Sequence, residues 1–142
     1  MVNNLRVVRF ERSGGMVTFT PALGGEAVLD VNKPGVRSEA YNGVRPFQPD
    51  ELAMFARLDL AALRHSHFTR DRSAPPPDLR DGYQYDITLD VSGSLPIVLV
   101  LYGELAAGQD TGAPGLADLA AWVGREIDAI LAQRVRLLQQ KR

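Results

Sequence analysis

The alternation of apolar and polar residues is cleanest just past the middle of the chain. Polar residues alternate with apolar or aromatic residues from 83 to 91. The apolar or aromatic positions are Tyr83, Tyr85, Ile87, Leu89 and Val91. This period of two predicts a β-strand with one buried and one solvated face. After a short turn at 92–94, the apolar run 95–102 predicts a strand covered on both faces. We expect the two strands to form an antiparallel hairpin.

The N-terminal region alternates in the same way. Residues 5–12 and 16–20 alternate, and Ser13, Gly14 and Gly15 stand between them, which predicts a hairpin turn with few side chains. Glycine adopts positive φ without steric cost and lets another backbone approach closely, so this turn serves either architecture or an interaction. The apolar run 27–31 then predicts either a third strand or an extension of the second.

Helical spacing occurs in two segments. Gln48 to Glu51 includes a proline and two acids, as at a helix start, and an apolar stripe continues to about Arg64: Leu52, Phe55, Ala56, Leu60 and Leu63. A long amphipathic helix is predicted over about 114–140, from the apolar residues Leu116, Leu119, Ala120, Val123, Ile127, Ile130, Leu131 and Leu138. Its final turns are expected to project beyond the core. Their mixture of apolar and basic residues indicates either a dimer contact or a helix end that favours basic residues, and we prefer the second.

Two segments show neither the helical nor the strand spacing of apolar residues. Residues 32–47 hold prolines, glycines and asparagines and predict a long loop, of a length that is often functional. The run 74–77 (APPP) predicts a stiff extended segment that cannot continue a helix. The whole pattern predicts one α+β domain over residues 1–142. We expect an antiparallel sheet of four to five strands, with the central helix and the long C-terminal helix packed on one face.

The amino-acid composition excludes several classes of function. The 142 residues are 45% hydrophobic and 23% charged, which suits one globular domain with its own core. The absence of cysteine excludes thiol catalysis, a cysteine-based zinc site and a disulfide framework. Sixteen basic and seventeen acidic residues give a formal net charge of −1, so we expect no general attraction to nucleic acid or to a membrane. Residues 1–6 do not resemble a signal peptide and no apolar run reaches the ~18 residues of a membrane helix, so a cytoplasmic location is expected.

The two histidines are the first residues to consider for chemistry. His65 and His67 stand at a spacing that could place two metal ligands together, but a zinc site needs a third ligand. The neighbouring arginines would repel a cation: Arg64, Arg70 and Arg72. We therefore predict no metal and no other cofactor.

Other catalytic patterns are also weak. Ser13 lacks the G-x-S-x-G pattern of a nucleophile turn, and neither glycine pair, 14–15 or 24–25, matches a phosphate-binding template. Four aspartates around the alternating strand could serve glycoside chemistry, but a solvated strand face explains them better: Asp78, Asp81, Asp86 and Asp90. The aromatic residues Tyr83, Tyr85 and Trp122 are interpreted as core packing rather than ligand stacking. We predict that the protein is not an enzyme; an enzyme using Asp81 and Asp86 is a third-ranked alternative.

A combination of these parts resembles the emfourin family, small bacterial protein inhibitors of thermolysin-type zinc metalloproteases. The resemblance spans about residues 5–131 and depends on the order of the parts: a strand ending in RSGG at 12–15, a strand leading to Pro21, a central helix, the strand DGYQYDI at 81–87, a further strand and a leucine-rich C-terminal helix. The chain departs from the family where Met16 replaces the usual aromatic residue. The loop 32–47 and the tail past 131 look like additions.

The resemblance implies an inhibitor whose Gly-rich loops enter the cleft of a zinc metalloprotease. It further implies apolar residues in the substrate subsites and a carboxylate near the catalytic zinc. The protease-binding candidates are residues of the two Gly-rich segments and the acids after them: Ser13, Gly14, Gly15, Met16, Leu23, Gly24, Gly25, Glu26 and Asp30. For Glu26 and Asp30, solvated acids flanking a strand are the competing interpretation. The alternative function is a non-enzymatic assembly module that forms a homodimer through the C-terminal helix.

Overall fold

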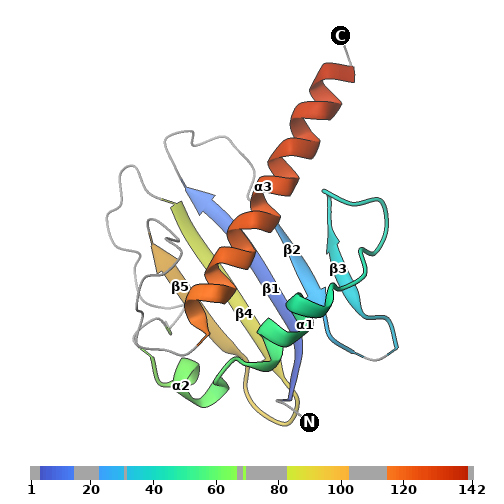
Figure 1. Cartoon of the computed structure of the whole chain (residues 1–142). Coiled ribbons are helices and arrows are strands. Elements are labelled where there is room, and N and C mark those ends of the chain that lie inside the picture. Colours follow the sequence, from blue (N-terminus) through green and yellow to red (C-terminus); the bar gives the residue numbers. More distant parts are fainter. Residues whose placement is uncertain are drawn as a thin grey trace.

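A computed structural model describes residues 4–14, 23–30, 32–66, 69, 83–102 and 115–140. Five strands form one antiparallel sheet in the order β3-β2-β1-β4-β5. Their bounds are β1 (Leu5–Gly14), β2 (Leu23–Val28), β3 (Gly35–Ser38), β4 (Tyr83–Val91) and β5 (Ile97–Tyr102). The helices are α1 (Pro49–Ala56), α2 (Leu60–Arg64) and α3 (Leu116–Gln140), and α3 crosses the face of the sheet on which α1 also lies (Figure 1). The predicted α+β fold is confirmed.

The strand pattern explains which face of the sheet carries the core. In β4, the odd-numbered positions 85–91 are buried and the even-numbered positions between them are half-buried, as the alternation predicted. Val8 and Phe10 of β1 are likewise buried, whereas Arg9 and Glu11 are exposed. The hairpin of β4 and β5 is antiparallel and pairs Leu89 with Ile97. The core therefore lies between this face and the helices.

The expectation that β5 is covered on both faces is wrong. Ile97, Leu99 and Leu101 are buried, but Val98 and Val100 are only half-buried. β5 is the last strand in the sheet order, and the described helices lie on one side of the sheet. The apolar run thus alternates in burial like its neighbour, although its residue types do not alternate.

The central helix is interrupted, in contrast to the prediction of one helix to Arg64. α1 ends at Ala56, and Asp59 begins α2, where its Oδ1 accepts a hydrogen bond of 3.0 Å from the backbone N–H of Ala62. Aspartate favours such a cap over a helix interior because its carboxylate binds free backbone N–H groups. Leu52, expected on the buried stripe, is 46% exposed.

The segment 32–47 is not entirely a loop. Its residues 35–38 form β3 and pair with β2, with Ala27 opposite Val36. Val36 and Arg45 then exchange backbone hydrogen bonds of 2.8 and 2.9 Å, which fold the rest of the segment back beside β3. Of the other predicted segments, the strand at 16–20 and the proline run 74–77 lie outside the described residues, and the run 27–31 supplies only the end of β2.

α3 is longer than the body that it covers. Its 25 residues span about 38 Å. Buried residues end at Ile130, and the final turns project past the sheet, as predicted (Figure 1). Among the residues that the structure describes, no helix combines the length and apolar character needed to cross a membrane.

Candidate functional site

The protease-binding candidates at the end of β1 lie where four strand ends meet. Gly14 pairs with Tyr83, Arg12 with Leu23, and Gln84 with Tyr102. The end of β1, the starts of β2 and β4 and the end of β5 are therefore neighbours at one end of the sheet, which we call the SGG end. Ser13 and Gly14 lie there. Gly15 and Met16 are outside the described residues.

The second glycine pair is not in a loop, contrary to expectation. Gly24 and Gly25 lie within β2, opposite Glu11 and Phe10. A Cβ at Gly24 would collide with the carbonyl oxygen of Phe10, and one at Gly25 would lie 2.6 Å from the carbonyl oxygen of Arg37. The close approach of neighbouring backbones thus explains both glycines. Leu23, the candidate before them, is a buried core residue.

The two candidate carboxylates lie in different places. Glu26 is on the sheet face away from the helices, with ion pairs of 3.7 Å to Arg9 and 3.6 Å to Arg37. Asp30 follows β2 at the end of the sheet opposite Ser13, where it forms an ion pair of 3.7 Å with Arg6. The structure therefore places Ser13 and Asp30 at opposite ends of the sheet and Glu26 between them, within β2. The segment that holds Glu26 is a strand, not one of the loops that the resemblance implies.

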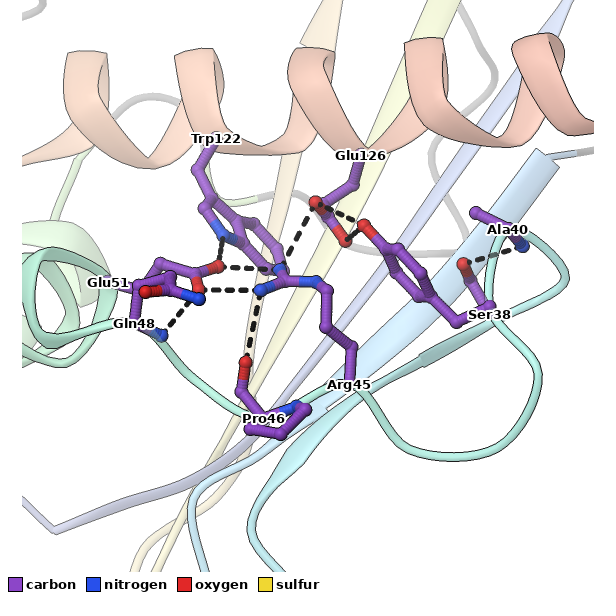
Figure 2. A network of polar contacts seen from close by, with 9 residues as sticks. Ser38, Ala40, Arg45, Pro46, Gln48, Glu51, Trp122 and Glu126 are labelled. Atoms are coloured by element: carbon purple, nitrogen blue, oxygen red, sulfur yellow. Dashed lines mark hydrogen bonds and ion pairs between the residues drawn. The ribbon is translucent and has the colours of Figure 1, made fainter.

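A buried polar cluster, which the sequence analysis did not find, joins α1, α3 and the segment before α1 (Figure 2). At its centre, Arg45 donates two hydrogen bonds of 2.7 Å to the two carboxylate oxygens of Glu51. Trp122 Nε1 of α3 donates to Glu51 Oε2 at 2.7 Å, and the backbone N–H of Gln48 donates to Oε1 at 2.9 Å. Glu51 therefore completes the first turn of α1 and also accepts bonds from two distant side chains.

Glu126 forms the second half of the polar cluster. The hydroxyl of Tyr41 lies 3.0 and 3.1 Å from its two oxygens, and Arg45 Nη2 lies 3.4 Å from Oε2. The guanidinium also stacks over the Tyr41 ring at 5.1 Å. Both carboxylates are buried. One arginine thus faces two acids, and its Nε atom has no hydrogen-bond partner among the described residues.

The pKa values in the cluster follow from these contacts. Burial raises the pKa of Glu51, but the hydrogen bonds from Arg45, Trp122 and Gln48 outweigh it and lower the pKa to about 2. The hydrogen bond to Glu51 raises the pKa of Arg45, and burial beside Glu126 raises the pKa of Tyr41. At neutral pH the central pair is charged, and Arg45 binds both carboxylate oxygens of Glu51. Its chemistry suits holding three segments together rather than exchanging protons with a substrate.

Sequence signals for this cluster were partial. The helix start at 48–51 indicated Glu51 as a first-turn acid, and a buried Trp122 requires an acceptor for its indole N–H. No sequence pattern predicted the contact between Glu51 and Trp122, because 71 residues separate them. Tyr85 and Trp122 are buried, which confirms their interpretation as core residues.

The remaining candidates for chemistry are scattered. His65 is exposed after α2, and His67 is outside the described residues. In the described ranges, no group of three or more histidine or acidic side chains could hold a metal ion. Asp86 lies on the sheet face away from the described helices and accepts a hydrogen bond of 3.0 Å from Gln84, whereas Asp78 and Asp81 are not described. No protein-family model, curated protein or solved structure matches this chain.

Proposed function

We propose that this protein is an emfourin-like inhibitor that binds reversibly to a thermolysin-type zinc metalloprotease. One observation carries the proposal: two motifs that support the resemblance are far apart in sequence and adjacent in the sheet. Arg12 pairs with Tyr85, Ser13 with Gln84, and Gly14 with Tyr83. The first motif and the tyrosine-containing motif are therefore neighbours in the fold.

The architecture also suits an inhibitor physically. The polar cluster ties α1 and the segment before it to α3, whose buried face packs on the sheet. Residues presented by a rigid body lose less conformational entropy when they enter a cleft than residues of a free chain do. Of the Gly-rich segments, Ser13 and Gly14 keep a place at a sheet end, while Gly24 and Gly25 do not.

The test is a titration of the purified protein into a thermolysin-type protease, with residual peptidase activity as the readout. Saturable inhibition at a one-to-one ratio is expected. Washing or dilution should restore activity, because the proposed binding is reversible. An absence of inhibition at micromolar excess, for every thermolysin-type enzyme encoded near its gene, would reject the proposal.

A second candidate function is an assembly module that dimerises through the end of α3. The observation in its favour is the exposure of Val135 and Leu138, at 52% and 66%, on the turns that project from the body. Deleting residues 132–142 and measuring mass in solution tests this function. Loss of a dimer would support it, and a monomer in both cases would remove its motivation.

A further inference from the structure

The last turns of α3 carry a stripe of apolar residues that the chain does not bury. Val135, Leu137 and Leu138 are 52%, 47% and 66% exposed. Together with the half-buried Leu131, they continue the helical spacing of the covered half of α3. Scattered exposed apolar residues are ordinary, but a continuous apolar stripe on a projecting segment marks a contact surface. We call residues 131–140 the α3 tail.

The charge of this region limits what can cover it. The sequence from 132 to 142 holds no acidic residue and four basic ones: Arg134, Arg136, Lys141 and Arg142. Two such tails packed side by side would bring like charges together, which costs free energy at an interface. The α3 tail therefore suits a surface that is both apolar and acidic, and not a second tail.

A surface with apolar residues and no described cover lies on the other side of the sheet. Val98 and Val100 of β5 lie on the sheet face away from the described helices, which we call the open face. In the register of the hairpin, Thr88 is opposite Val98 and Asp86 is opposite Val100. The unbroken apolar run of β5 is typical of a strand covered on both faces, but the described helices cover only one (Figure 1).

The open face is acidic around β4. Asp86 and Asp90 lie on it, and Glu11 of β1 is directly opposite Asp86, an arrangement of like charges that destabilises a sheet. Within the described ranges, none of these three acids forms an ion pair. Arg9, on the same face of β1, is paired with Glu26 on the side of β2. The β4 side of the open face therefore combines negative charge with two valines.

We infer that the α3 tail of one copy of this chain packs on the open face of β4 and β5 of a second copy. The tail is basic and the open face around β4 is acidic, and each has apolar side chains for the other to cover. Their lengths also agree. The ten residues of the tail span about 15 Å of helix, and β4 from Asp86 to Asp90 spans about 14 Å.

Symmetry allows both copies to make this contact. Each copy has one tail and one open face, so a two-fold symmetric pair makes the contact twice and closes the assembly. Because charge attraction contributes, the dimer should weaken as the salt concentration rises. The inference rests on the second candidate function, self-association through the end of α3, and names the surface that receives the tail. It does not depend on protease inhibition.

The experiment measures the dissociation constant of the dimer by sedimentation equilibrium of the full chain. Asp86→Lys on the open face and Arg136→Glu on the tail should each raise the constant at least about tenfold, because each sets like charges against the second copy. The double variant reverses the charge on both surfaces and should return the constant to within about threefold of wild type. Asp50→Lys makes the same charge change at the exposed start of α1 and is the matched control, with a change of less than about threefold.

The outcomes separate this inference from the second candidate function. Asp86→Lys should fold at least as stably as wild type, since it replaces one of two facing acids, and thermal unfolding at low protein concentration checks this. If deletion of residues 132–142 abolishes the dimer and Asp86→Lys leaves it unchanged, the tail contacts another surface and the inference is wrong, although self-association stands. A double variant as weak as the single variants would also overturn the inference. A wild-type protein that stays monomeric at millimolar concentration would overturn both.

Discussion

The two halves of α3 have the same kind of sequence and different surroundings. Up to Ile130, its apolar residues are buried against the sheet and its Glu126 belongs to the polar cluster. Beyond that point, Val135 and Leu138 continue the apolar spacing but are exposed. An amphipathic pattern therefore predicts a helix reliably without predicting how much of it is covered, because coverage depends on how far the sheet extends.

The boundary between the halves is marked by one surface contact. Arg134 Nε donates to Glu39 Oε1 at 2.6 Å, and Glu39 follows β3, the edge strand at the other end of the sheet order from β5. An exposed ion pair of this type contributes only about 0–1 kcal/mol. If cover by the sheet decides how much each half of α3 stabilises the fold, mutations before Arg134 should lower the free energy of unfolding strongly and mutations after it only slightly.

The largest effect is expected for Trp122→Ala in the first half. The indole is buried, packs edge-on against Phe10 and Phe55 at 5.3 and 5.1 Å between ring centroids, and donates a hydrogen bond to Glu51. Its loss should lower the free energy of unfolding by about 3–5 kcal/mol, measured by denaturant titration. Leu138→Ala is the matched control in the second half. Comparable losses of unfolding free energy in the two variants would mean that the two halves of α3 do not differ in their contribution to stability.

The next effect concerns the pH dependence that Glu51 confers. Because its pKa is lowered from 4.5 to about 2 in the folded protein, its ionised form stabilises the fold at neutral pH by about 3 kcal/mol. This contribution is fully present above about pH 4.5, the unfolded value, and is lost as the pH falls toward 2.

Unfolding free energies of wild type and Glu51→Gln, measured between pH 2 and pH 7, test this expectation. The difference between the two proteins should be largest at neutral pH and should shrink in acid. Taking the difference removes the contribution of the other acids, which both proteins share. A difference that stays constant with pH would mean that Glu51 contributes through packing and not through its charge.

A smaller loss is expected for Glu126→Gln, at the end of the covered half. The amide can still accept from the Tyr41 hydroxyl but loses the charge 3.4 Å from Arg45. We expect a loss of about 1–2 kcal/mol in unfolding free energy. A double-mutant cycle of Glu126→Ala and Tyr41→Phe, each of which removes the hydrogen bond between the two side chains, measures their direct contact. Purely additive effects would show that the two side chains are not coupled.

The sequence predicted those parts whose cause is local. The alternation in β4 and the first-turn acid Glu51 are read from neighbouring residues, and both are present in the structure. The division of the central helix was missed because the capping role of Asp59 outweighs the helical stripe around it. β3 and the pairing of Glu51 with Trp122 depend on contacts across the sheet and across 71 residues, which no local pattern encodes.

The smallest effect is expected in the projecting half of α3. Leu138→Ser removes a side chain that is already in solvent, so the monomer's free energy of unfolding should change by less than about 0.5 kcal/mol. Denaturant titrations of wild type and Leu138→Ser at two protein concentrations measure this and also detect association, since a dimer is stabilised as concentration rises. Concentration-dependent stability in wild type that Leu138→Ser abolishes would show that a second copy covers the tail. The first half of α3 would then be buried by the chain itself and the second half by a second copy of the chain.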